Sequence, residues 1–176
     1  TIAVLPDVSS QKLKQNYQPF IDYLEGYIDM KVRLVIPKDY QELVTQFREK
    51  KIDLALFGGL TLIKAVEFYG AEALVTREID TRFTSWFITQ SESDSNVLSD
   101  FKGKSIVFGS QLSTAGHLMP RYFLQEMFDQ PVESYFGDVS FSGSHDNTVL
   151  NIAQRKASLG AVNALVAQTM LKDGTV

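Results

Sequence analysis

Two stretches of the chain combine small and hydroxylic residues with a histidine, a pattern that suits the binding of an oxyanion. The first is GSQLSTAGHLMP at 109–120, and the second is FSGSHDNTVLNIAQ at 141–154. Each follows a short apolar run typical of a strand and begins a segment with helical periodicity. A helix N-terminus presents unpaired N–H groups and about half a positive charge, and hydroxyl and imidazole groups add donors. The two stretches therefore predict a site for a small oxyanion such as phosphate, phosphonate or sulfate.

Purely structural roles are open to the same residues. Ser113 and Thr114 could cap their helix without binding anything, as these residue types often do. His145 could be a solvated first-turn residue or a local cap. Because two such clusters occur together, we favour ligand binding for all three side chains. His117 lies one turn further into its helix, and we expect it to pack behind the site or to be exposed rather than to contact the ligand.

Catalysis is the main alternative, because serine, histidine and aspartate occur together here. The sequence has no G-x-S-x-G nucleophile elbow, and His145 and Asp146 are neighbours whose side chains would diverge rather than align. Two histidines and no cysteine give no metal-ligand pattern. Neither a P-loop nor a dinucleotide-binding motif is present. We therefore predict a binding protein, not an enzyme, with no catalytic residues, no metal and no cofactor.

Length and composition narrow the class of protein further. The chain has 176 residues, 44% of them hydrophobic, which is enough for one domain or two small lobes with a true core. The net charge of −4 argues against a nucleic-acid surface. No apolar run is long enough to span a membrane. The absence of cysteine fits an exported protein, although many cytosolic domains also lack it.

The elements that must position these residues alternate between strands and helices. Apolar runs predict strands at 2–5, 31–36, 52–58, 84–90, 105–109, 138–142 and 159–163. Helical periodicity follows at 13–28, 40–50, 60–69, after residue 109, and near 145–156. Asp39 and Glu42 suggest a capping box at the start of the second helix, and Pro19 predicts a kink or restart near Gln18 in the first. The alternation indicates an α/β fold with parallel strands and right-handed crossovers.

Apolar and aromatic side chains indicate which sides of the helices pack. In the helix after 109, one side carries Leu118, Met119, Tyr122, Phe123 and Met127. Tyr17, Tyr23 and Tyr27 are expected mostly on a helix face and in the core, not as a stacking platform, and Trp86 is expected in the core. The stretch SESDSN at 91–96 is polar and turn-rich. A lobe boundary is expected near 84–92, which gives a first lobe at 1–86, a second at 87–170 that carries the anion site, and a tail or start of a return segment at 171–176.

Three ordered motifs make the chain similar to a known family. DYQELVTQFREKKIDLALFGG, SDFKGKSIVFGSQLSTAGHLMP and FSGSHDNTVLNIAQRKASLGAVN resemble the phosphate/phosphonate-type periplasmic substrate-binding proteins of ABC importers. The resemblance covers about residues 20–170. It implies the type II periplasmic-binding fold, with two α/β lobes that close on an oxyanion. Because family chains normally return to the first lobe, it also implies a fold that is incomplete at the C-terminus.

The resemblance also implies a set of ligand-binding residues. In the second lobe these are Ser113, Thr114, Ala115 and Gly116 (the last two through backbone N–H groups), Ser144, His145 and Asn163; in the first lobe they are Tyr40, Phe57 and Gly58. Asn163 could equally form strand-end hydrogen bonds, and Tyr40 could pack beside its helix. The family often has a serine where Ala115 stands and a tyrosine where Leu62 stands.

The expected function is recognition without chemistry. The anion would dock on the second lobe and the first lobe would close over it, delivering phosphonate, phosphate or phosphite to the membrane permease of an ABC importer. Such a protein works in the periplasm or another extracytoplasmic space, although the chain shows no signal peptide. Two alternatives use the same fold. The chain could be the extracytoplasmic sensor of a histidine kinase or cyclase, or a module with a degenerate cleft that contacts only another protein.

Overall fold

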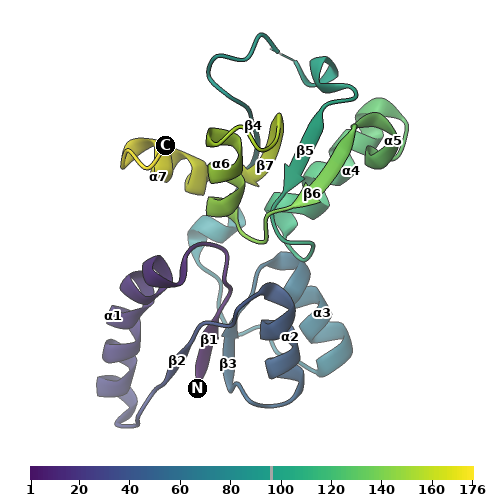
Figure 1. Cartoon of the computed structure of the whole chain (residues 1–176). Helices are drawn as coiled ribbons and strands as arrows, with labels where there is room; N and C mark the ends of the chain where they lie inside the picture. The colour runs from purple at the N-terminus through teal and green to yellow at the C-terminus, as the bar shows by residue number, and fades with distance from the viewer. Residues whose placement is uncertain (96) are drawn as a thin grey trace. The chain divides into compact units, whose positions relative to one another are not determined.

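The computed structural model describes residues 1–95 and 97–176, which divide into two units, Thr1–Leu74 and Val75–Val176. Each unit has a sheet and helices of its own (Figure 1). Asn96, the last residue of the polar stretch expected at 91–96, lies outside the described residues.

Unit 1 contains a parallel sheet of three strands in the order β2-β1-β3. Its elements follow one another as β1 (Ile2–Val4), α1 (Ser10–Ile28), β2 (Leu34–Val35), α2 (Tyr40–Arg48), β3 (Leu54–Leu56) and α3 (Gly59–Tyr69). A small apolar core of Ala3, Leu43 and Ile52 joins the sheet to α2. The predicted alternation of strands and helices is confirmed, although β2 and β3 are shorter than the apolar runs suggested.

Helix α1 differs from its prediction in two ways. It continues through Pro19 as one helix, so the expected restart near Gln18 is wrong. Pro19 is exposed, so water can reach the carbonyl whose partner N–H the ring removes. Tyr23 and Tyr27 are 67% and 77% exposed and stack on each other, so the prediction that they face the core is also wrong.

The start of α2 shows part of the expected capping box. The Asp39 carboxylate accepts the Glu42 N–H at 2.7 Å, as predicted. The Glu42 carboxylate accepts the Lys38 N–H, also at 2.7 Å, one residue before the N–H that a capping box uses. One unpaired N–H of the helix start and one backbone N–H just before it are therefore satisfied.

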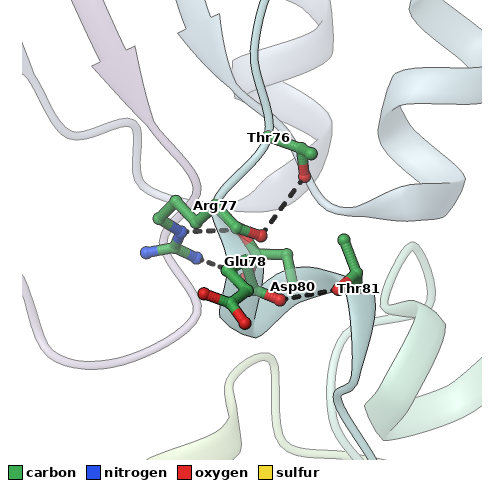
Figure 2. A network of polar contacts seen from close by, with 5 residues as sticks. All are labelled: Thr76, Arg77, Glu78, Asp80 and Thr81. Atoms are coloured by element: carbon green, nitrogen blue, oxygen red, sulfur yellow. Dashed lines mark hydrogen bonds and ion pairs between the residues drawn. The ribbon is translucent and has the colours of Figure 1, made fainter.

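A short polar turn lies early in unit 2, at the 3₁₀ helix η1 (Glu78–Thr81). Figure 2 shows its network: the Arg77 guanidinium donates Nε–H to Asp80 Oδ2 at 2.6 Å and Nη2–H to Asp80 Oδ1 at 2.8 Å. The Thr81 hydroxyl donates to the Glu78 carbonyl at 2.7 Å, and the Thr76 hydroxyl to that of Arg77 at 3.5 Å. A bidentate Arg–Asp pair fixes the turn geometry, although its exposure limits its contribution to stability.

Unit 2 contains a four-stranded sheet in the order β4-β7-β5-β6 (Figure 1). Strands β5, β6 and β7 are parallel, and β4 runs antiparallel to β7. The elements after η1 are β4 (Ser85–Ile88), the 3₁₀ helix η2 (Leu98–Phe101), β5 (Ser105–Phe108), the π-helix η3 (Thr114–Leu118), α4 (Met119–Phe128), α5 (Val132–Tyr135), β6 (Asp138–Phe141), α6 (His145–Ala153), β7 (Leu159–Asn163) and α7 (Ala164–Lys172).

Side-chain alternation along β5 gives the sheet two apolar faces. Ile106 and Phe108 point to one face and pack with Leu124 of α4 and with α5. Val107 points to the other face and packs with Ile152 of α6. Helices therefore cover both faces of this sheet, as expected where parallel strands are buried.

The predicted inward face of α4 is wrong. Leu118, Tyr122, Phe123 and Met127 are all exposed, and the helix buries Pro120 and Leu124 instead. Periodicity identifies an apolar side of a helix, but it does not show whether that side meets the core or the solvent.

The division between the units falls earlier than predicted. It lies after Leu74, whereas the expected boundary between 86 and 87 falls inside β4, a strand of the second sheet. Trp86, expected in the core, is 37% exposed on that strand. Within the described residues, none of the helices combines the length and the apolar character needed to cross a membrane.

Candidate functional site

The candidate residues of unit 2 gather where parallel strands β5, β6 and β7 end. The loop after β5 leads to Ser113, the loop after β6 leads to Ser144, and Asn163 is the last residue of β7. Carboxyl ends of parallel strands share one sheet edge, which is where open α/β sheets bind ligands. Two backbone hydrogen bonds join the loops: Ser142 N–H to the Phe108 carbonyl at 2.8 Å, and Gly143 N–H to that of Gly109 at 3.2 Å.

Residues 109–116, which we call the anion loop, end in the π-helical turn. Ser113 is buried and caps this turn, with its Oγ accepting the Gly116 N–H at 2.9 Å. Helix capping and ligand binding are therefore compatible roles for Ser113. The oxygen serves as a cap, and its hydroxyl proton has no acceptor among the described residues, so it can still be donated to an anion. The Gly116 N–H, in contrast, is already used by the cap.

Glycine at 116 allows a close approach between the anion loop and α6. A Cβ on Gly116 would lie 3.0 Å from His145 Cε1 and 3.0 Å from Ser113 Oγ, both tighter than ordinary contacts. The Gly116 carbonyl also accepts the Gly109 N–H at 2.9 Å, which closes the loop on itself. The absence of a side chain at this position therefore brings Ser113 and His145 to the same place.

His145 is a buried, neutral hydrogen-bond donor in this arrangement. Its side chain is 5% exposed, and Nδ1 accepts the Asn163 N–H at 3.3 Å, which leaves the proton on Nε2. Burial lowers the pKa of His145 to about 4, against a smaller opposing effect of the Asp146 carboxylate. No described residue accepts the Nε2 proton, so it can be donated to a ligand. The imidazole of His145 is therefore neutral at physiological pH.

Ser144 is placed differently from Ser113. Its Oγ caps α6 by accepting the Asn147 N–H at 3.4 Å, but its own proton goes to the Asp146 carboxylate. Asp146 accepts the same Asn147 N–H at 3.0 Å. The Ser144 hydroxyl is therefore occupied, and a carboxylate lies beside it, so this cluster offers an anion its backbone N–H groups and His145 rather than a free hydroxyl.

Asn163 forms hydrogen bonds at the end of its strand, one of the two roles considered for it from the sequence. Its Oδ1 caps α7 by accepting the Leu165 N–H at 2.9 Å, and its own N–H holds the imidazole of His145. The side-chain amide nitrogen has no partner among the described residues. Asn163 thus orients His145 and retains one donor group.

The first-lobe candidates belong to unit 1. Tyr40 is the first residue of α2 and is 2% exposed. Phe57 packs edge-on against Phe47, with ring centroids 5.3 Å apart. Gly58 precedes α3 and donates its N–H to Thr61 Oγ1 at 3.0 Å. Their roles as ligand contacts stay predictions.

Sequence reasoning missed several residues that build the site. Gly109 and Ser142 join the two loops, and buried Thr148 donates to the Ser144 carbonyl at 3.1 Å and contacts Ser142 Oγ at 2.7 Å. Thr148 lies four residues after Ser144, on the same helix face, and this spacing was the available signal. Among residues 1–95 and 97–176, acidic and histidine side chains form no group able to hold a metal ion.

Comparisons with known proteins identify the family of the chain. The family model for the phosphonate periplasmic substrate-binding protein of ABC transporters matches residues 2–176, so the chain belongs to that family. This is a family of transport proteins rather than of enzymes. Its solved relatives share the type II periplasmic-binding fold, which confirms the predicted fold class.

Individual relatives show what is bound within the family. A probable ABC transporter phosphite binding protein, PhnD1 of Prochlorococcus marinus, is 31% identical over 98% of this chain and 60% of its own length. The phosphate-import protein PhnD of Mycolicibacterium smegmatis is 31% identical over 99% of this chain and 58% of its own. The structure of PhnD1 in complex with methylphosphonate aligns with a TM-score of 0.90 and 29% identity, covering 99% of this chain and 66% of that one.

The chain therefore spans less than two thirds of the length of these relatives. More distant structures share the fold alone. One of them is a VFT2 domain of Bordetella pertussis BvgS, at 15% identity and a TM-score of 0.56. A likeness at that level does not favour the sensor alternative over the transport family.

Proposed function

We propose that this protein binds a small phosphorus oxyanion (phosphonate, phosphite or phosphate) as the extracytoplasmic capture component of an ABC importer. The observation that carries the proposal is the family match over residues 2–176, together with the convergence of Ser113, Gly116 and His145 at the carboxyl edge of the second sheet. The permease of the importer is the proposed partner, and the periplasm or its equivalent is the proposed location.

The donor set suits an anion whose charge is spread over several oxygens. A free hydroxyl proton on Ser113, the Nε2–H of neutral His145 and first-turn N–H groups such as that of Ala115 would each meet one oxygen. Charge would be balanced by backbone dipoles rather than by a paired cation, because His145 is neutral at physiological pH. Hydrogen bonds to a charged acceptor contribute about 1.5–3 kcal/mol each, so a few suffice for selective binding.

A ligand screen tests this proposal directly. Methylphosphonate, aminoethylphosphonate, phosphite, phosphate, sulfate and small carboxylates are compared by thermal shift and then by titration calorimetry. A ligand at about 100 times its Kd stabilises the folded state by about 2.7 kcal/mol, which raises Tm by roughly 5 °C in a chain of this size. We expect a rise with one or more phosphorus oxyanions and none with carboxylates.

A matched variant separates specific binding from general salt effects. Arg155→Met removes an exposed ion pair to Glu92 in the same unit, with both side chains more than two thirds exposed, and leaves the anion loop intact. This variant should retain the ligand-induced shift. A well-folded wild-type protein that responds to none of the phosphorus oxyanions would contradict the proposal.

A further inference from the structure

His117, in the π-helical turn that ends the anion loop, is held by hydrogen bonds on both ring nitrogens. Nδ1 lies 2.8 Å from the Gln111 carbonyl oxygen, and Nε2 lies 2.8 Å from Arg121 Nε. Arg121 in turn pairs with Glu133 through Nη1 at 2.7 Å. The three side chains form one chain of hydrogen bonds that runs from α5, through α4, to the backbone of the anion loop.

The partners of His117 determine its protonation state. A carbonyl can only accept, so Nδ1 must carry a proton, and Arg121 can only donate, so Nε2 must be bare. The neutral Nδ1–H tautomer alone satisfies both contacts. If Nε2 were protonated, it would face a donor and a positive charge at hydrogen-bond distance, and the link to Arg121 would be lost.

The surroundings of His117 leave the ring little freedom. Phe108 of β5 and Phe141 of β6 meet it edge-on, with ring centroids 5.2 Å and 4.9 Å away. The Arg121 guanidinium lies over the Phe108 ring at 5.3 Å. The strands thus present apolar rings, and the charged groups that face His117 are Arg121 from α4 and Glu133 from α5. Burial is the largest effect and lowers the pKa of His117; the hydrogen bond to the Gln111 carbonyl raises it, the Arg121 charge lowers it by less, and Glu133 raises it least.

This chain of contacts holds the segment that carries the anion donors. Gln111 lies two residues before Ser113, and His117 directly follows Gly116. The hydrogen bond from His117 Nδ1–H to the Gln111 carbonyl therefore closes a loop that contains both Ser113 and Gly116. A π-helical turn is a rare conformation and needs such local support. Arg121 matters because it keeps Nε2 bare and so keeps the Nδ1 proton directed at the loop.

We propose that His117 is a positioning residue for the anion site, held in its neutral Nδ1–H form by Arg121 and Glu133, and that protonation in acid weakens this support, because the imidazolium keeps its Nδ1–H bond to Gln111 but loses the link to Arg121. The inference rests on the proposed function, because it assigns to that site a pH-dependent support that does not itself touch the ligand. Above the pKa of His117 the loop is held; below it the Arg121 link breaks and anion affinity falls.

The test compares four forms of the whole chain: wild type, Arg121→Met, Arg121→Lys and the control Arg155→Met. Methylphosphonate affinity is measured by calorimetry from pH 5 to 8, and the His117 tautomer is read by long-range ¹H–¹⁵N NMR without ligand. Arg121→Met should weaken binding about tenfold at pH 8, the equivalent of one lost hydrogen bond. Arg121→Lys, which retains a donor, should recover part of that loss, and Arg155→Met should show no change.

The pH profile distinguishes positioning from general damage. Ionisation of the ligand and of His145 affects wild type and Arg121→Met equally, so both cancel in the ratio of their affinities. We expect wild type to bind about ten times more tightly than Arg121→Met at pH 8. This ratio should fall toward one as pH falls through the pKa of His117, because acid breaks the His117–Arg121 hydrogen bond in wild type too. A ratio that stays constant with pH overturns the proposal.

The NMR measurement judges the inference independently of anion binding. Wild type should show the Nδ1–H tautomer, and Arg121→Met should show a mixture of the two neutral tautomers. An Nε2–H tautomer in wild type, or an unchanged tautomer in Arg121→Met, overturns the proposal. If wild type shows the expected tautomer but binds none of the phosphorus oxyanions, the proposed function fails, and with it the claim that His117 serves an anion site.

Discussion

The two helix starts of unit 2, at Ser113 and at Ser144, look alike in sequence and differ in structure. Both serines cap a helix that follows a parallel strand. Ser113 begins a π-helical turn, and its hydroxyl proton has no acceptor among the described residues. Ser144 begins an ordinary α-helix and gives its proton to Asp146. The same residue type in the same local role therefore offers different chemistry, because the neighbouring side chain decides where the hydroxyl proton goes.

In the proposed anion site the two starts would contribute different donors. The first would offer the Ser113 hydroxyl, on a loop that is shaped by Gly116 and contacted by His117. The second would offer the buried imidazole of His145, which Asn163 orients. Gly116 joins them, since a side chain there would meet the His145 ring. Each prediction below alters one of these two helix starts or the glycine that joins them.

The largest effect is expected from removing the hydroxyls of the first start. Ser113→Ala with Thr114→Ala should weaken phosphorus oxyanion binding by about 3 kcal/mol or more, because each hydrogen bond to a charged acceptor contributes about 1.5–3 kcal/mol. Titration calorimetry measures the change. Ser9→Ala, which removes the cap of α1 in unit 1, is the control for loss of a helix cap and should leave affinity unchanged. Unchanged affinity in the double variant would show that the hydroxyls of the first helix start do not contact the ligand.

A second prediction concerns the neutral histidine of the second start. The pKa of His145 is about 4 in the folded protein and about 6.5 when unfolded, so the unfolded state binds more protons between these values. Stability should therefore fall as pH drops from 6.5 to 4, with a contribution from His145 of about 3 kcal/mol, at 1.36 kcal/mol per pH unit.

Urea unfolding at several pH values checks this slope against the variant His145→Asn. The variant lacks the titrating ring, so its stability should change less between pH 6.5 and 4 than that of wild type. Parallel pH profiles for the two proteins would show that His145 is not held neutral by burial.

A smaller effect is expected at the glycine that joins the two starts. In Gly116→Ala the new Cβ would meet His145 Cε1 and Ser113 Oγ at 3.0 Å, so the imidazole must shift. Overpacking of this kind costs about 1–3 kcal/mol, and we expect anion affinity to fall by roughly tenfold. Gly109→Ala is the matched control, because its Cβ would lie 3.5 Å from Gly116 Cα, an ordinary contact. Equal affinities for the two variants, measured by calorimetry, would show that the close approach is not needed.

Local sequence signals predicted the elements of the fold well. The expected strands at 105–109, 138–142 and 159–163 correspond to β5, β6 and β7, and the helix expected from His145 begins there. These signals depend on side-chain periodicity and on N-capping, which act within a few residues. Periodicity did not show which apolar sides meet the core: Tyr122 and Met127 of α4 are exposed.

The candidate site was predicted less completely than the fold. Residue type and position in the sequence selected Ser113 and His145 as candidates, whose ligand contacts stay predictions, and suggested that His117 packs behind the site or is exposed. They could not show that the Asn163 N–H holds His145, because eighteen residues separate the two. They also could not show that Asp146 takes the Ser144 proton while the Ser113 proton stays free.

The sequence by itself therefore determined the α/β alternation, the two capped helix starts and the family to which the chain belongs, because each depends on short-range patterns. Tertiary structure decided which protons and N–H groups face a ligand, which tautomer each histidine adopts, and which glycine allows the two starts to meet. Those properties depend on distances between residues far apart in the chain. Hydrogen-bond geometry and burial, unlike capping or periodicity, are established only when the strands have paired.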